Sequence, residues 1–498
     1  MVANQELQGN SPDHTTNGRE SRLFSRYEID ARIHDEMFGQ DGTPHRHCRR
    51  LHDALNAMPL DRIATMQDHA ARSFLEDGIT FSVYGAEGPQ ERIIPIDLLP
   101  RLIDASDWQV IEDGLVQRLQ ALNKFLGDIY GSARILADGV IPVDLVYGCT
   151  QYRVEMRGLT PKHGVYVSVC GSDIIRDTDG FKVLEDNLRS PSGVSYMLAN
   201  RQAVSASLRT LYRLHSVRPI GHYGALLRKC LAEMAPSGVS DPCIVLLTPG
   251  VHNAAYYEHM FLAREMGIEL VQGSDLTVHK GFVYMRTTRG PRRVDVVYRR
   301  INDEYIDPLV FRPDSRLGVP GLFLAFRLGN VAIANAPGTG VADDKAVYSY
   351  VPDMIRYYLG EEPLLPNVET FLCRERKGLE YTLDNLDTLV VKCVGESGGQ
   401  GMLVGPHSTR DERNSFAKKV RSNPSNYISQ PAINFSRSPC LSPEGAVARH
   451  VDLRPFILQG NKTRLVPGAF CRVALRAGSL VVNSSQGGGG KDVWVLEN

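Results

Sequence analysis

The sequence predicts an α/β fold, and two kinds of segment carry this prediction. Residues 105–131 place apolar side chains at helical spacing and end in Gly131, which predicts an amphipathic helix in a helical amino-terminal layer. The apolar positions of this helix are Val110, Ile111, Leu115, Leu119, Leu122 and Leu126. Residues 243–310 alternate between strand and helix patterns, starting with "CIVLLTPG" and "AAYYEHMFLAREMG". Such alternation is typical of a doubly wound domain with a parallel sheet.

The other predicted elements follow in chain order. The runs "GVYVSVCGSDIIRD" and "FKVLEDNL" predict two strands joined by a "DTDG" turn, and "SYMLANRQAVSASLRTLYRLH" predicts a helix after them. From about residue 345 the pattern changes to a helix, "DKAVYSYVPDMIRYYLG", and then to short strands separated by glycine-rich loops. No G-x-G-x-x-G motif follows the strand at 243, so we expect a scaffold or substrate domain there rather than a dinucleotide site.

Composition argues against several classes of protein. The 56 Lys and Arg residues balance 57 Asp and Glu residues, so the chain has no overall basic field for a nucleic acid. No stretch reaches the roughly 18 consecutive apolar residues of a membrane span. The amino end is polar, lacks the apolar core of a signal peptide and predicts a disordered leader. Nine cysteines without a C-x-x-C pair indicate a reducing compartment, so we expect a cytoplasmic protein.

A carboxylate and a carboxamide stand two apart in "KVLEDNLRSPSG". Side chains two apart on a strand share a face, so Glu185 and Asn187 are expected to point together. Asp173, on the preceding strand run, can face them across the hairpin. Carboxylate and amide oxygens suit Mg²⁺, whereas a transition metal would favour His or Cys. The pattern predicts a magnesium site; the alternative is a pair of surface charges on an antiparallel hairpin.

A lysine precedes a glycine-rich loop in "LDTLVVKCVGESGGQGMLVG". The pattern predicts a strand ending at Lys392, a loop with glycines at 395, 398, 399 and 401, and a returning strand. It is not a P-loop, in which the lysine follows the glycines and a helix comes next. Glycines let backbone N–H groups approach an anion, and a lysine supplies a point charge for phosphate. The segment therefore predicts a lid over a nucleotide triphosphate; the alternative is an ordinary hairpin with a surface lysine.

Together these motifs resemble the ATP-grasp ligases, in an unusual order. In most such enzymes the lysine and glycine flap come first, whereas here "SDIIRDTDGFKVLEDNLRSPSG" precedes "VVKCVGESGGQG". That order resembles the circularly permuted ATP-grasp family, type 2, which is related to glutathionylspermidine synthase and eukaryotic glutathione synthetase. The resemblance extends from about residue 27, where "YEIDARIHDEMFGQDGTPHRH" is similar to the family's amino-terminal signature, to the end of the chain.

The resemblance implies roles for individual residues. It implies magnesium ligation by Asp173, Glu185, Asn187 and Glu396. It implies nucleotide binding by Lys345, Lys392, Gly398, Gly399 and Gly401, with Gln430 and Ile433 near an adenine-holding hinge strand. It implies catalytic roles at the phosphates for Arg454, Arg472 and Asn483, the last beside the loop 487–490. The alternatives are an exposed lysine at a helix start, structural ion pairs of the two arginines and a flexible glycine linker.

The same resemblance implies a domain plan and a reaction. We expect a leader over 1–26, a helical layer with the metal strands over 27–215, a Rossmann-like pre-ATP-grasp domain over 216–344 and an ATP-binding lobe over 345–498. The permutation further implies that strands near the two ends of the chain meet in space.

The implied activity is an ATP- and Mg²⁺-dependent ligation of a carboxylate and an amine, on a small molecule or a peptide, through an acyl phosphate. The alternatives are a non-catalytic ATP-binding module that binds a peptide or partner proteins, and phosphotransfer to another acceptor. One departure argues against glutathione as the substrate: the run before Asp173 is "CGSDII", with Ser172 and no arginine.

Overall fold

A six-stranded sheet forms the centre of the molecule. The computed structural model describes residues 22–85, 88–395, 401–476, 478–480, 482 and 488–497. The sheet order is β3-β21-β20-β19-β4-β5, with β21 parallel to β3 and the other neighbours antiparallel. Its strands are β3 (Ile96–Ile103), β4 (Val169–Asp177), β5 (Gly180–Asn187), β19 (Arg454–Gln459), β20 (Thr463–Val473) and β21 (Gly489–Val495). The sheet thus joins strands from both ends of the chain, as the permutation implies.

Helices cover both faces of this sheet because its side chains alternate in direction. Ile457 of β19 belongs to the core beneath α3 (Ala105–Ile129), whereas its neighbours Phe456 and Leu458 belong to the core beneath α2 (Leu60–Glu76) and α6 (Val194–Ser207). A strand that is buried on both faces carries a continuous run of apolar residues, which explains the apolar end of "HVDLRPFIL".

The long helix α3 matches the predicted helix over 105–131, with one correction. Its first turn is capped by Asp104, whose carboxylate accepts a hydrogen bond from the Asp107 amide at 2.8 Å. Five of its six predicted core positions are buried, but Val110 is 48% exposed. Trp108, which the apolar spacing did not select, is fully buried instead. The helix therefore presents a face slightly rotated from the one that we predicted.

The predicted α/β domain is a four-stranded parallel sheet in the order β12-β11-β6-β7. Val245 and Leu247 of β6 pack on the side of α10, whereas Ile244 and Leu246 pack on the side of α8 and α9, so both faces are covered. The elements of this domain are α8 (Tyr223–Glu233), β6 (Ile244–Leu247), α9 (Tyr256–Met266), β7 (Glu269–Val271), β11 (Val296–Arg299), α10 (Leu322–Arg327) and β12 (Ala332–Ala334). A separate three-stranded sheet consists of β8 (Leu276–His279), β9 (Phe282–Thr287) and β10 (Gly290–Val294).

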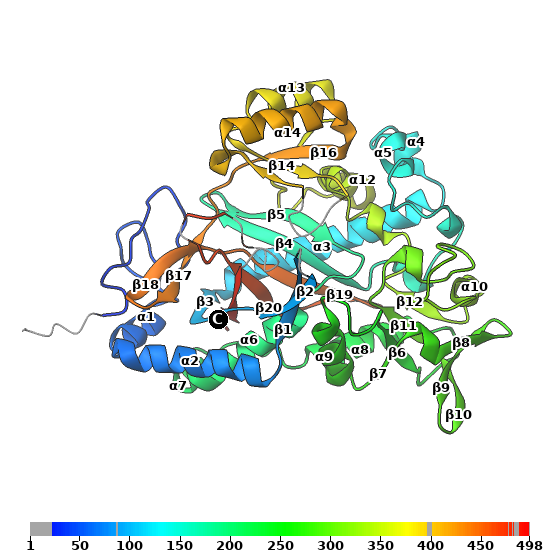
Figure 1. The fold of residues 1–498 in the computed structure, drawn as a ribbon, viewed down its shortest axis with the longest axis horizontal. Coiled ribbons are helices and arrows are strands. Elements are labelled where there is room, and N and C mark those ends of the chain that lie inside the picture. The colour runs from blue at the N-terminus through cyan, green and yellow to red at the C-terminus, as the bar shows by residue number, and fades with distance from the viewer. Residues whose placement is uncertain are drawn as a thin grey trace, which may run out of the picture.

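A small lobe stands above the β4–β5 edge of the central sheet (Figure 1). Its sheet has the order β13-β16-β14-β15, and Val391 and Leu403 pack with Phe416 of its outer helix in a separate core. The elements of the lobe are β13 (Phe371–Leu372), α13 (Arg376–Asp384), β14 (Leu389–Cys393), β15 (Leu403–Val404), α14 (Arg410–Ser422) and β16 (Tyr427–Pro431). The segment 345–498, expected as one lobe, thus divides between this lobe and the central sheet.

Shorter elements complete the fold. The helices are α1 (Arg49–Asn56), α4 (Arg134–Ala137), α5 (Val143–Tyr147), α7 (Arg209–Leu214), α11 (Lys345–Tyr348) and α12 (Val351–Leu359). Two hairpins pair β1 (Thr80–Gly85) with β2 (Gly88–Ile93), and β17 (Arg437–Ser442) with β18 (Gly445–His450). Leu23 is already buried, so the packed chain includes residues of the expected 1–26 leader. No helix in the described part of the chain combines the length and apolarity needed to cross a membrane.

Candidate active site

The β4–β5 hairpin brings the predicted oxygen ligands together. Asp173 lies directly opposite Glu185, and Asn187 lies opposite Gly171, so the three side chains share one face of the hairpin. The Asn187 amide nitrogen donates to the Gly171 carbonyl at 3.1 Å, which fixes the orientation of its carboxamide. A bulge then shifts the register, so that Ile174 lies opposite Val183, which is fully buried on the other face.

The carboxylate between the two predicted ligands points away from the site. Asp186 is buried and accepts two hydrogen bonds from Arg118 Nε of α3, at 3.0 and 2.8 Å. The Ser172 hydroxyl donates to the same carboxylate at 2.7 Å. Ser172 is therefore a structural residue on the face opposite to the predicted ligands.

Two arginines from the carboxy-terminal half meet at Asp173. Arg454 Nη2 donates to its Oδ2 at 2.7 Å, and Arg472 Nη2 donates to the same atom at 2.6 Å. Arg472 also binds the buried Asp452 through Nε, at 2.9 and 3.1 Å. Burial alone would raise the pKa of Asp173, but the two guanidinium groups outweigh it and hold that pKa well below its ordinary value. In this arrangement Asp173 orients the arginines.

Two lysines approach Glu185 from other elements. Lys345, at the start of α11, lies 3.8 Å from the Glu185 carboxylate, and Arg454 lies 3.9 Å from it. Lys392 of β14 donates to the Gln430 carboxamide oxygen at 2.7 Å, and Gln430 in turn donates to Thr370 at 3.0 Å. Burial lowers the pKa of Lys392 to about 8, against the attraction of Glu185. An anion bound beside this partly buried lysine would stabilise its charged form.

The turn after Asn187 is fixed by a buried ion pair of the parallel-sheet domain. Glu258 of α9 accepts the Gly193 amide at 2.7 Å and the Ser195 hydroxyl at 3.0 Å. Arg300 binds Glu258 at 2.9 Å and donates to the Pro191 carbonyl at 2.7 Å. Because Ser192 lies in the same turn and its carbonyl accepts from Arg454 at 3.2 Å, the turn also positions one of the arginines.

Other positioning residues escaped sequence reasoning. Asn335 follows β12 and accepts the Ser168 and Val169 amides at 2.8 and 2.9 Å, which ties β4 to the parallel-sheet domain. Asp343 binds Arg189 at 2.6 Å, just before Lys345. Only Asp452 had a local signal, two residues before Arg454 in "HVDLRP".

The remaining predicted residues divide into three groups. Gln430 accepts a hydrogen bond from Lys392 through its side chain, whereas Ile433 is partly buried against the apolar cluster that includes Phe435 and Val368. Gly401 is described and has a positive φ of 64°, in the left-handed region that favours glycine. Outside the described residues lie Glu396, Gly398, Gly399, Asn483 and Gly487.

The donor set fits a nucleotide triphosphate and a hard divalent cation. Lys345, Lys392, Arg454 and Arg472 bring four cationic groups to one place, as a phosphate chain requires. Glu185 and Asn187 offer the oxygen ligands that Mg²⁺ prefers. Within the described parts of the chain no group of three His, Cys, Asp or Glu side chains is placed to hold a metal.

The family model for circularly permuted ATP-grasp type 2 matches residues 100–474. The chain belongs to this family. The coarse activity that follows is ATP-dependent ligation, and the resemblance inferred from the order of the motifs is confirmed.

Three comparisons show how far similarity extends. An "Uncharacterized protein" of Synechocystis sp. is 49% identical over 467 residues, which cover 93% of this chain and 97% of the relative. A Frankia casuarinae protein named "Putative glutamate--cysteine ligase 2-2" is 41% identical over 84% of this chain, but the match covers only 48% of that protein. The solved structure of a glutathione synthetase-like effector of Globodera pallida aligns with a TM-score of 0.54 at 13% identity, covering 88% of this chain and 97% of that one. The last comparison shows the fold alone.

Proposed function

We propose that this protein is an ATP-dependent carboxylate–amine ligase that forms an amide or peptide bond through an acyl phosphate. The observation that carries the proposal is the convergence of Lys345, Lys392, Arg454 and Arg472 on the face of the hairpin that bears Glu185 and Asn187. Lys392 comes from β14 of the small lobe, Lys345 comes from α11 before that lobe, and the two arginines come from the central sheet. A nucleotide between the two parts would meet all four cations.

The chemistry has two steps with balanced atoms. A substrate carboxylate oxygen attacks the γ-phosphorus of ATP, the bond to the β-phosphate oxygen breaks, and ADP leaves. The amine then attacks the acyl carbon, inorganic phosphate departs with the electron pair of the carbon–oxygen bond, and the amine loses a proton. Both steps move negative charge among phosphate oxygens, so fixed cations stabilise the transition states without a covalent nucleophile on the protein.

Each residue has an assigned part in this scheme. Lys392 and Lys345 neutralise the phosphates of the nucleotide, and Arg454 and Arg472 neutralise the transferred phosphoryl group. Asp173 and Asp452 hold those arginines in place through the ion pairs described above. Glu185 and Asn187 would hold Mg²⁺, which would offset phosphate charge when bound. The buried Glu258–Arg300 pair fixes the turn that frames this face.

The test is phosphate release from ATP with pooled amino acids, peptides and polyamines, followed by mass spectrometry of the products. We expect Mg²⁺-dependent ADP and phosphate release that needs both an acid and an amine, and a product lighter than the two substrates together by one water. ATP binding without turnover on any pool would favour the non-catalytic alternative. A phosphorylated product that survives added amine would favour phosphotransfer to another acceptor.

A further inference from the structure

A charged cavity of about 540 Å³ lies beside the site and has no part in the proposed reaction scheme. It is bounded by the segment before α1, by the β17–β18 hairpin and by residues near 476–479. Its charged lining residues are Arg26, Glu28, Arg437, Glu444, Arg449 and Arg476. The volume is within the range of small-ligand sites, and the lining suits an anion.

The arginines of this cavity are presented in different ways. Arg449 is held by two backbone carbonyls, with Nε 3.1 Å from Leu475 O and Nη1 3.0 Å from Ala448 O, so its guanidinium has a fixed direction. Arg476 is exposed, and no side-chain partner for it occurs among the residues that the structure describes. A fixed guanidinium beside a free one offers two donors of the kind that bind carboxylates in a bidentate manner.

A neutral histidine forms the inner wall. His450 Nδ1 lies 2.5 Å from the Phe435 carbonyl, so this nitrogen carries the proton and Nε2 is left to accept from Arg437 Nε at 3.4 Å. Burial lowers the pKa of His450 to about 4, so the ring stays neutral at physiological pH. The histidine therefore orients Arg437 without adding a competing positive charge.

The balance of charges selects the class of ligand. The lining contains four arginines and two glutamates. Arg26 and Glu444 form an ion pair at 3.0 Å, and their side chains are 70% and 78% exposed. An exposed pair of this kind contributes little and can exchange with a ligand. Carboxylates of a ligand would meet the arginines, while Glu28 and Glu444 would accept an ammonium group. An acidic peptide with a free amine combines these groups, whereas a polyphosphate would leave the two glutamates without a cationic partner from the ligand.

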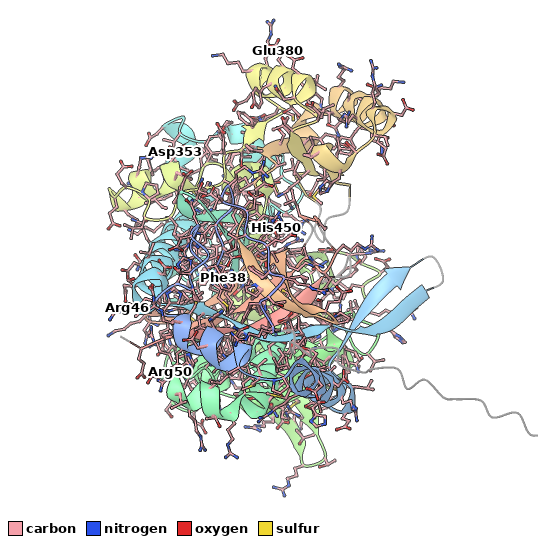
Figure 2. The ribbon with its side chains drawn as sticks, turned by 90° about the vertical axis from the view of Figure 1, so that its left-hand side faces the viewer. Phe38, Arg46, Arg50, Asp353, Glu380 and His450 are labelled. Carbon is pink, nitrogen blue, oxygen red and sulfur yellow. The ribbon has the colours of Figure 1, made fainter. Side chains whose placement is uncertain are left out.

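The inner wall lies close along the chain to two residues of the candidate active site. Val451, the next residue after His450, bridges Val473, and these two residues are adjacent to Asp452 and Arg472 respectively. At about 3.3 Å per residue along an extended chain, His450 and Asp452 are separated by roughly 7 Å. Figure 2 shows His450 at mid-height, between Phe38 and the small lobe. A peptide of a few residues bound in the cavity is therefore long enough to extend from His450 toward Arg472.

We propose that this cavity binds an acidic peptide, with carboxylates on Arg449 and Arg476, and directs one carboxyl group toward Arg472. This inference rests on the proposed ligase function, because it assigns the carboxylate substrate of the same site. Its chemical class is a peptide with two or more carboxylates and a free amine.

The test is calorimetric titration of the full chain, without nucleotide, with a triglutamate peptide, a triglutamine peptide or inorganic phosphate. We expect triglutamate to bind at least about tenfold more tightly than triglutamine, since charge-assisted hydrogen bonds discriminate by more than about 1.4 kcal/mol. Arg476→Gln should weaken triglutamate binding about three- to tenfold without affecting the fold, because its side chain is exposed. Arg449→Gln should weaken it similarly. Arg316→Gln, an exposed arginine outside the cavity, is the matched control and should bind as the wild type does.

Three outcomes would overturn the inference. Equal affinity for the two peptides would show that binding is not specific for carboxylates. Unchanged binding in both cavity variants would show that the peptide binds elsewhere. Displacement of triglutamate by equimolar phosphate would indicate a plain anion site. Lys392→Ala separates the two proposals, since it should weaken ATP binding and leave triglutamate binding intact. If the wild type binds the peptide but not ATP, the cavity remains a peptide site and the proposed ligase function is refuted.

Discussion

At the scale of single residues, charge compensation decides what each group can do. Asp173 is held ionised by Arg454 and Arg472, so its oxygens are already committed to hydrogen bonds. Glu185 is 28% exposed and touches its cationic neighbours only at 3.8 and 3.9 Å. Of the two carboxylates, Glu185 is therefore the one that can bind a cation without breaking a close ion pair.

The first prediction follows from this difference. Glu185→Gln should reduce Mg²⁺-dependent turnover by about 100-fold or more, because it removes a charged ligand without changing the shape of the side chain. The melting temperature should change little, since the ion pairs of Glu185 with Lys345 and Arg454 are long. Glu380→Gln is the matched control, as Glu380 lies at the outer end of the small lobe in Figure 2 and should leave turnover intact. A folded Glu185→Gln protein with full activity would refute the metal assignment.

The second prediction concerns the protonation of Lys392. Its pKa is lowered from 10.5 to about 8, and nucleotide phosphates favour the charged amine, so ATP binding should draw in a proton as the pH passes 8. ATP affinity should therefore fall above about pH 8. Titration at about pH 8.5 in two buffers of different ionisation enthalpy measures the proton uptake. Lys392→Met, which cannot titrate, should bind ATP weakly and show no uptake.

The same shift has a consequence for stability, with a definite sign. Between about pH 8 and 10.5 the unfolded chain holds more protons on this lysine than the folded chain does, so its contribution to the free energy of unfolding rises with pH across that window. Below pH 8 the buried ammonium remains a cost, which an anion bound nearby would offset.

At the scale of elements, the β4–β5 hairpin and the turn after it set the direction of the site residues. The bulge between Asp173 and Ile174 lets Glu185 face the site while Val183, two residues earlier, faces the core. The turn ends at Gly193, whose φ of 122° is open to glycine and strained for other residues. A Cβ added there would lie 2.9 Å from Phe470 Cδ1.

The third prediction compares two glycines of this region. Gly193→Ala should destabilise the protein by about 1–3 kcal/mol and lower turnover, because the turn carries the Ser192 carbonyl that binds Arg454. Gly180→Ala is the matched control: its φ is 123°, but a Cβ there would meet nothing within 4 Å. Denaturant unfolding and ATP turnover of both variants separate backbone strain from packing. Equal losses in the two variants would show that Phe470 does not constrain the turn.

At the scale of the whole molecule, the carboxy-terminal strand closes the central sheet. β21 lies between β3 and β20, so it pairs on both sides with strands from opposite ends of the chain. Lys491 is fully buried and donates to Asp97 at 2.8 Å, and Trp494 is fully buried beneath the helices of the amino-terminal half. A central strand of this kind cannot be removed without exposing both neighbours.

The fourth prediction is that removal of residues 480–498 abolishes folding. The deletion exposes the edges of β3 and β20 and the core around Trp494, so we expect loss of the cooperative thermal transition and of turnover. Trp494→Ala is the milder comparison and should cost about 3–5 kcal/mol while retaining the fold. Circular dichroism with heating measures both. A truncated chain that still melts cooperatively would contradict a central role for β21.

Sequence alone determined the outline of the fold and predicted the chemistry of the site. Residue types at fixed spacing, such as Glu185 with Asn187 on one strand, follow from local periodicity, which the backbone geometry enforces. The order of the two motifs was enough to predict the permuted family, and the strand and helix patterns were enough to predict the parallel-sheet domain. These features depend on residues that are close in sequence, so a short stretch of sequence is enough to predict each of them.

Only the tertiary structure decided how the charges are paired. Asp173 meets Arg454 and Arg472 because β4, β19 and β20 are assembled in one sheet, and nothing local in the sequence marks such a pairing. The bulge that turns Val183 inward is likewise invisible in an alternating pattern. Long-range pairing depends on which strands become neighbours, and that depends on the burial of the whole core rather than on any single segment.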